Sequence, residues 1–222
     1  MTMLQAQTYQ YDDAWGNAGM TLKSQSSTGV NLNFSITEFT LTENVIDGIP
    51  MQNILMPNAF LPNNEGAPDL PGFGRYIAIP QGATAKLNIL SLRTETITGV
   101  EIAPAPRIPL DTETGPLEYN KNERLYSQNA YYPAEPFLLS EQTQLRGVDA
   151  AIVGITPYQY NHVTKELVIY RDIEIEIVFE GGNGHFGEDR LRSRWFDPIL
   201  QDALLNSESL PKIDYSARYY NQ

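Results

Sequence analysis

The alternation of apolar and polar residues between positions 167 and 180 most constrains the fold of this chain. One parity carries the apolar side chains Leu167, Ile169, Ile173, Ile175, Ile177 and Phe179. Because successive side chains of a β-strand point to opposite faces, this segment predicts a strand with one buried and one solvated face. The other parity carries the carboxylates Asp172, Glu174 and Glu176. Such a ladder could bind calcium or serve a glycosidase, but any half-buried strand alternates in this way, so we favour a solvated sheet face.

Further strands are indicated by short apolar segments separated by the 16 glycines and 15 prolines. They are residues 31–40, 75–79, 85–94, 97–102 and 148–155. We expect 148–155 to be buried on both faces and to form a hairpin with 167–180 through a loop at 158–165. Strands this short bury their apolar faces only against a second sheet. The predicted fold class is therefore mainly β, an antiparallel, jelly-roll-like β-sandwich with a short C-terminal helical extension.

A helix is predicted near the end of the chain, after the glycine-rich segment 181–187. Asp197 is suited to the N-cap and Pro198 to the first helical position, and the apolar stripe ends at Asn206. We expect three parts: an N-terminal segment with a first strand region (1–27), the sandwich (28–180), and a linker with a short helix leading toward a further domain (181–222). The last part should pack loosely, with Trp195 and Phe196 anchoring the helix and with a frayed end.

Composition excludes several classes of function. The 222 residues carry a net charge of -12, which disfavours nucleic acid as a partner because phosphate binding relies on clustered lysine and arginine. No apolar segment has the roughly 18 to 20 residues of a membrane-spanning helix, so no membrane span is expected. The absence of cysteine removes thiol catalysis, thiolate metal sites and disulfides. Residues 1–7 lack the features of a signal peptide, and we expect a trimmed start.

No catalytic constellation is evident. His162 falls in the predicted loop 158–165 and His185 in the glycine-rich segment, where exposed, chemically idle residues are usual. No motif for a nucleophile, a phosphate or a dinucleotide follows a strand, so neither enzymatic activity nor a cofactor or metal is expected. Tyrosines near predicted loops could form a sugar-binding platform, although buried rings with wet hydroxyls are commoner; they are Tyr119, Tyr126, Tyr131, Tyr132, Tyr158 and Tyr160. A carbohydrate-binding or adhesin-type module is thus one candidate function.

Successive blocks of the chain resemble the N-terminal prodomain of the gingipain-type cysteine peptidase family. The most specific block is P-x-Q-Y-N-x-x-T-K-x-L-x-I-Y at residues 157–170. The other blocks follow in the family's order at 66–79, 82–89, 100–104, 132–137 and 145–147, and the resemblance covers residues 28–206. It implies a non-catalytic β-sandwich that assists the folding of its protease and blocks the active site until it is cleaved away.

The resemblance also implies a partner, a location and contact residues. The partner would be the catalytic domain of the same precursor, with this chain monomeric and exported to the periplasm, cell surface or medium. In the family, the loop after the I-A-P block reaches the specificity pocket, and here that loop is 104–116. Its candidate contact residues are Arg107, Ile108 and Asp111, with either charged residue able to address the pocket; a secondary contact is expected at Arg190, Arg192 and Arg194. The prolines of the loop 104–116 restrict φ and pre-organise an extended segment, which lowers the cost of entering a cleft. A stiff loop that contacts only solvent would have the same sequence pattern.

Overall fold

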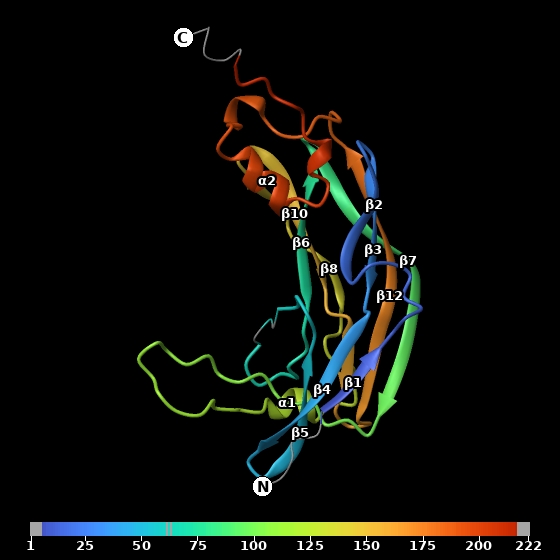
Figure 1. Ribbon diagram of the computed structural model, residues 1–222, viewed down its shortest axis with the longest axis vertical. Coiled ribbons are helices and arrows are strands. Elements are labelled where there is room, and N and C mark those ends of the chain that lie inside the picture. Colours follow the sequence, from blue (N-terminus) through green and yellow to red (C-terminus); the bar gives the residue numbers. More distant parts are fainter. Residues whose placement is uncertain (1–5, 61, 63, 217–222) are drawn as a thin grey trace.

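The chain forms two antiparallel β-sheets packed face to face (Figure 1). The computed structural model describes residues 6–60, 62 and 64–216. In the first sheet the order is β6-β10-β8, with β9 also paired to β10: β6 (Phe73–Ile79), β8 (Phe137–Leu139), β9 (Thr143–Leu145) and β10 (Val148–Ile155). In the second the order is β11-β12-β3-β2, with β7 paired to β12 along its length: β2 (Gly19–Ser26), β3 (Gly29–Ser35), β7 (Ala83–Thr98), β11 (Tyr158–Asn161) and β12 (Glu166–Gly181).

A smaller sheet continues from one end of the sandwich, at the bottom of Figure 1. Its order is β1-β4-β5, with β1 (Ala6–Gln10), β4 (Glu38–Ile46) and β5 (Ile49–Leu55). The short helices in the described residues are α1 (Glu123–Tyr126), α2 (Asp197–Ala203) and the 3-10 turns η1 (Asp189–Leu191) and η2 (Ser207–Ser209). None of these helices is long and apolar enough to cross a membrane.

The core lies between the two sheets and confirms the predicted antiparallel sandwich. The apolar parity of β12 is buried throughout, and its Ile173, Ile175 and Ile177 are fully inaccessible to solvent. Across the interface Phe34 of β3 meets Phe73 of β6 edge to face, with ring centroids 5.1 Å apart. The alternation in the sequence therefore places one face of β12 in the core, as predicted.

The predicted hairpin between residues 148–155 and 167–180 is wrong. Both segments are strands, but β10 pairs with β6, β8 and β9, whereas β12 forms its hairpin with β11. Residues 158–161 are a strand because Tyr158 and Tyr160, two residues apart, both bury their rings in the core. The expected strand 85–94 lies within β7, whereas only Ile97 and Thr98 of the expected strand 97–102 belong to β7, which ends at Thr98. The expected strand 31–40 divides into β3 and β4 around Ile36.

The C-terminal segment does not pack loosely, contrary to expectation. Leu200, Leu204 and Leu210 are buried in the main core. Leu205 N–H donates to Tyr76 C=O at 2.9 Å, and this contact covers the edge of β6. An uncovered edge would leave backbone groups unpaired, which explains why the segment docks there. Expected fraying beyond residue 216 lies outside the described residues.

Asn206 fixes this segment to β6 through a pair of buried hydrogen bonds. Its Oδ1 accepts from Ala78 N–H at 2.7 Å, and its Nδ2 donates to Ala78 C=O at 2.9 Å. The predicted anchoring role of Trp195 is wrong, because this side chain is 72% exposed. Phe196 instead lies under the guanidinium of Arg146, 3.6 Å from its ring centroid. Aliphatic residues and Asn206 therefore hold the segment in place.

Candidate functional site: the projecting loop

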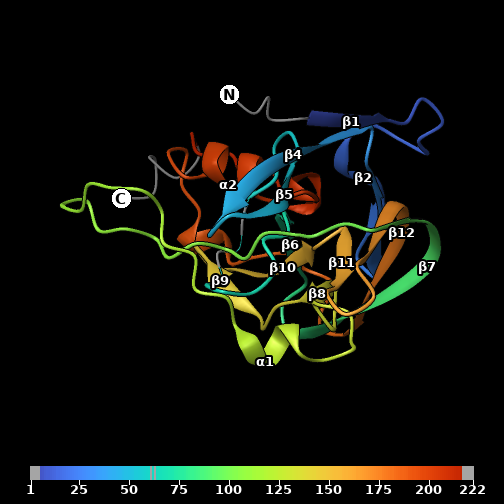
Figure 2. The same ribbon diagram turned by 90° about the horizontal axis from the view of Figure 1, so that it is seen from below.

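The segment after Ile102 leaves the sandwich as a long loop that projects sideways, drawn in yellow-green (Figures 1 and 2). Its entry limb is fixed to the body by backbone hydrogen bonds. Ala103 N–H donates to Gln52 C=O at 2.9 Å, and Ala105 N–H donates to Ala67 C=O at 2.7 Å. Ala103 and Ala105 are both buried. The loop thus begins from a rigid base.

The exit limb returns to the same part of the body. Asn122 N–H donates to Gly66 C=O at 2.9 Å, and Gly66 N–H donates to Ala105 C=O at 2.9 Å, so one glycine joins both limbs. Gly66 has a φ of +78°, and a Cβ there would lie 2.3 Å from Asn120 O. Only glycine fits this close approach. Behind the exit limb, Asn122 caps α1 by accepting from Leu125 N–H, and Tyr126 of α1 is buried.

Within the loop, Arg107 links the two limbs at the neck. Its N–H donates to Glu118 C=O at 2.8 Å, and its guanidinium contacts two carboxylates: Nε lies 2.9 Å from Glu118 Oε2 and Nη2 lies 3.0 Å from Glu113 Oε2. Hydrogen bonds to Glu118 and Glu113 raise the pKa of Arg107. Arg107 therefore acts within the loop, as a brace between residues that lie far apart along it.

The tip of the loop is a hydrogen-bonded turn. Glu113 N–H donates to Leu110 C=O at 2.9 Å, which places Asp111 and Thr112 at the two corners. The Glu113 carboxylate accepts from Leu110 N–H at 2.9 Å, and this bond and then Arg107 lower the pKa of Glu113. Asp111 is exposed, and among the described residues no ion-pair partner lies within reach of it. Ile108 is also exposed, so the three candidate residues share one loop but differ in position.

The three arginines after the glycine-rich segment do not form one surface. Arg192 is buried and makes a two-pronged contact with Asp197, Nε to Oδ1 at 2.7 Å and Nη2 to Oδ2 at 2.8 Å. Its guanidinium is thus part of the packing of α2, and the expectation that Arg192 is a surface contact is wrong. Arg190 is exposed beside Glu188, and the guanidinium of Arg194 lies 4.6 Å from the Trp195 ring centroid.

His162 is not the exposed, idle residue that the sequence predicts. Its Nδ1 lies 3.0 Å from Oε1 of Glu101, just before the entry limb, and its Nε2 lies 3.3 Å from Lys121 Nζ on the exit limb. Burial and then the charge of Lys121 lower the pKa of His162. Lys165 also contacts Glu101, at 2.9 Å. The hairpin turn at His162 therefore ties together the bases of the two limbs, and the one sequence signal of its importance is its place inside the specific block 157–170.

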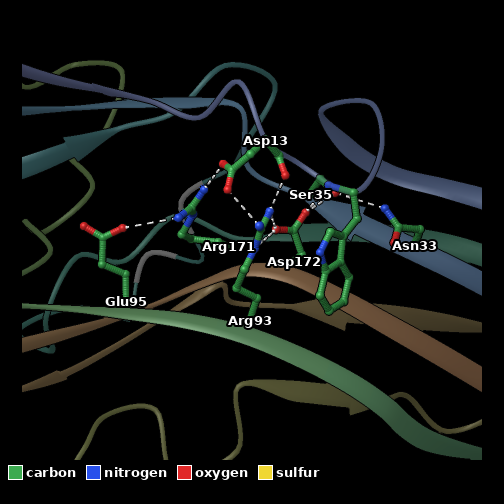
Figure 3. Close-up of polar contacts among 8 residues, drawn as sticks. Asp13, Asn33, Ser35, Arg93, Glu95, Arg171 and Asp172 are labelled. Carbon is green, nitrogen blue, oxygen red and sulfur yellow. Dashed lines mark hydrogen bonds and ion pairs between the residues drawn. The ribbon is translucent and has the colours of Figure 1, made fainter.

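The predicted carboxylate ladder is not a uniform solvated face. Asp172 is fully buried because the connection between β1 and β2 covers it, and its carboxylate faces Arg93 (Figure 3). Arg93 Nε donates to Asp172 Oδ2 at 2.7 Å, Ser35 Oγ donates to Oδ1 at 2.7 Å, and Trp15 N–H donates to Oδ1 at 2.8 Å. Asp13 lies between Arg93 and Arg171 and contacts both. The cluster fastens the β1–β2 connection to the sheet.

The remaining carboxylates of the ladder contact basic or amide side chains, and three of the candidate tyrosines are buried. Glu174 contacts Lys23 Nζ at 2.6 Å, and Glu176 accepts from Asn88 Nδ2 at 3.3 Å. In the described part of the chain no three acidic or histidine side chains are grouped to hold a metal ion. Tyr126, Tyr158 and Tyr160 are buried, so they offer no sugar-binding platform.

Comparisons with known proteins identify relatives of the chain. The family model Propeptide_C25 matches residues 13–212. Lys-gingipain HG66 of Porphyromonas gingivalis is 28% identical over 184 residues, which cover 77% of this chain and 10% of that protein. Gingipain R1 of the same species is 32% identical over 118 residues, covering 52% of this chain and 12% of the relative. The chain thus spans 10 to 12% of the length of these relatives.

Two solved structures share the fold. One is described as the complex of Porphyromonas gingivalis RgpB pro- and mature domains; it has a TM-score of 0.74 and 23% identity, and the match covers 87% of this chain and all of that one. The other concerns the zymogenic latency of gingipain K from the same species, with a TM-score of 0.66, 25% identity and 80% of this chain covered. The family model matches nearly the whole chain, and the chain therefore belongs to the Propeptide_C25 family, the non-catalytic prodomains of gingipain-type cysteine peptidases.

Proposed function

We propose that this chain is the prodomain of an exported, gingipain-like cysteine endopeptidase, which it helps to fold and keeps inactive until it is cleaved away. Its partner is the catalytic domain of the same precursor, and the prodomain is otherwise monomeric. The sandwich, which begins with β2 at Gly19 and ends with β12 at Gly181, supplies the inhibitory body, and the segment that follows it leads toward the catalytic domain.

The projecting loop is the observation that carries this proposal. Its two limbs are fixed to one segment of the body through Gly66, and Arg107 braces its neck. A segment that is already ordered loses little conformational entropy when it enters a cleft, so its contacts are converted more fully into affinity. Exposed Ile108, Leu110 and Leu117 supply apolar surface that a cleft would cover. These features fit a segment that occupies an active-site cleft.

A secondary contact with the protease involves the surface before α2. Arg190 and Arg194 are the basic residues that this surface offers, because Arg192 is buried against Asp197. This surface lies at the end of the molecule far from the loop (Figure 1). Charged residues at the rim of an interface mainly accelerate association. We therefore expect Arg190→Ala to slow association at low salt with little change in dissociation.

Inhibition by the isolated chain tests the proposed function. The catalytic domain of the same precursor is titrated with wild-type chain, with a variant in which residues 107–118 are replaced by glycine and serine, and with Asp12→Asn. Asp12 is an exposed acidic residue on the β1–β2 connection. That connection lies on the opposite side of the molecule from the projecting loop (Figures 1 and 2). We expect the wild type and Asp12→Asn to inhibit equally and the loop replacement to lose inhibition.

Folding of the variants is checked first by circular dichroism and thermal unfolding. No inhibition by a folded wild type would overturn the inhibitory role, and undiminished inhibition by the loop replacement would move the contact away from the loop. Assistance in folding is tested separately, by refolding the denatured catalytic domain with and without the chain. An equal yield of active protease in both would contradict it.

A further inference from the structure

Residues 104–118 carry four charged side chains, and three of them are paired with one another. The fourth, Asp111 at the tip of the loop, takes part in none of these ion pairs. Arg107 is bonded to Glu113 and Glu118, so its guanidinium is held against the loop by two carboxylates. Asp111 occupies a corner of the turn that Glu113 N–H and Leu110 C=O close. The side chain presented at the tip is therefore acidic, whereas the basic side chain is turned back on its own loop.

The positions of Arg107 and Asp111 along the loop also favour Asp111 as the side chain that a partner meets. Arg107 sits at the neck, where its backbone N–H meets Glu118 C=O at 2.8 Å. For the Arg107 side chain to enter a pocket, both of its ion pairs would have to break, and with them the brace of the neck. Asp111 can be presented with every one of these contacts intact, since it takes part in none of them. The tip thus reaches a partner before the neck does.

The charge of the loop favours a basic recipient. Residues 104–118 contain one arginine against three carboxylates, on a chain with a net charge of -12. A pocket that accepts an arginine or lysine side chain carries negative charge and would repel this loop. A pocket that accepts a carboxylate carries arginine or lysine and would attract it.

We propose, on the basis of the prodomain function above, that Asp111 is the side chain that the loop places in the specificity pocket of its protease, and that this pocket accepts acidic side chains. Arg107 is a positioning residue: through Glu113 it holds the turn from Leu110 to Glu113 that presents Asp111. The prodomain then records the preference of a protease that cleaves after acidic residues.

Substrate profiling of the catalytic domain tests the pocket without using the prodomain. Peptide substrates that differ only in the residue before the scissile bond, aspartate, glutamate, leucine, arginine or lysine, are compared by kcat/KM. We expect aspartate to be preferred over arginine and lysine by at least about tenfold, because a bidentate cation in the pocket distinguishes these charges. A preference for arginine or lysine overturns the proposal.

Inhibition constants of matched variants test the residue. Asp111→Asn, which keeps shape and removes charge, should weaken inhibition by about 30-fold or more, since it leaves the cation in the pocket unpaired. Asp12→Asn, the same change elsewhere, should leave inhibition unchanged. Inhibition by wild type that Asp111→Asn does not weaken overturns the role of Asp111 while leaving the prodomain function standing, whereas a wild type that does not inhibit overturns both.

Amide hydrogen exchange in the loop tests the positioning role of Arg107. Arg107→Gln should accelerate hydrogen exchange at the Leu110 and Glu113 amides and weaken inhibition, and Arg107→Lys should restore part of both. Asp111→Asn should leave this exchange unchanged, because Asp111 is outside the brace. If Arg107→Gln weakens inhibition while loop exchange stays at the wild-type rate, Arg107 contacts the protease directly and the assignment is wrong.

Discussion

Replacing Arg93 by methionine tests how strongly the buried cluster of Figure 3 fastens the β1–β2 connection to the sheet. Asp172 has a side chain that is 1% exposed, whereas the Arg93 side chain is 27% exposed. In Arg93→Met the carboxylate keeps two donors, Ser35 Oγ and Trp15 N–H, but loses its cation. A buried carboxylate left without its cation is costly, because two neutral donors replace only part of the hydration that it had in water.

The expected magnitude follows from these exposures. Removing one partner of a buried ion pair costs about 3 to 5 kcal/mol, and the partial exposure of Arg93 places this variant near the lower end, at about 3 kcal/mol. For a chain of this size that lowers Tm by about 6 to 12 °C. Asp172→Asn should cost less, about 1 to 2 kcal/mol, because Arg93 keeps its contact with Asp13 at 2.9 Å.

Urea unfolding at pH 7 of wild type, both single variants and the double variant gives the free energies of unfolding for a double-mutant cycle. We expect the double variant to be more stable than the sum of the single losses implies, since methionine opposite asparagine leaves no buried charge. A loss below about 1 kcal/mol in Arg93→Met, or strictly additive losses, would refute the reasoning that the pair is energetically buried.

Three further changes test other parts of the structure. Asn206→Ala leaves the backbone N–H and C=O of Ala78 without partners in the core, so the free energy of unfolding should fall by about 2 to 4 kcal/mol in urea titrations; an unchanged urea midpoint would contradict this. Gly66→Ala forces a Cβ toward Asn120 O at a φ of +78° and should cost more than about 1 kcal/mol and accelerate exchange of the Asn122 amide, whereas wild-type exchange would show that the base of the loop tolerates the side chain. His162 has its pKa lowered by burial and by Lys121, so its stabilising contribution is complete above its unfolded pKa of about 6.5 and is lost as pH falls through the folded value; urea midpoints of wild type should therefore fall more steeply below pH 6.5 than those of His162→Gln, and parallel profiles would contradict the shift.

The sequence predicts the elements of this fold better than their partners. The alternation in 167–180 identifies β12 because the period of two is local information. The pairing of strands is not local information. The segments that form β10 and β12 follow one another closely in the sequence, which suggests a hairpin. In the structure β11 pairs with β12, whereas β10 belongs to the other sheet. The loose packing expected of the C-terminal segment fails for the same reason, because the free edge of β6 that receives Asn206 lies 128 residues away in the chain.

At the candidate site too, local features could be predicted from the sequence, whereas long-range contacts could not. The prolines between residues 104 and 116 predict a stiff loop, and the structure has a projecting loop there (Figure 1), with Arg107 bonded to both of its limbs. Which charged residue the loop presents depends on the pairing of Arg107 with Glu113 and Glu118, and no local pattern encodes that pairing. The limbs are tied by His162 and Lys121, whose contact spans 41 residues, so the histidine looked idle when only its neighbours in sequence were considered.

The docking of the C-terminal segment on β6 also determines when folding can be completed. A chain that is synthesised from its N-terminus exposes β6 long before Asn206 is available, since the contact joins residues 128 apart. The hydrogen bond from Trp15 N–H to the Asp172 carboxylate likewise forms only after Asp172, 157 residues later, has been synthesised. Contacts of such long range make folding slow, and an uncovered strand edge is open to association with other chains in the interval. Both contacts must therefore form late in folding, and the interval before them is when association with other chains competes with the folding of this one.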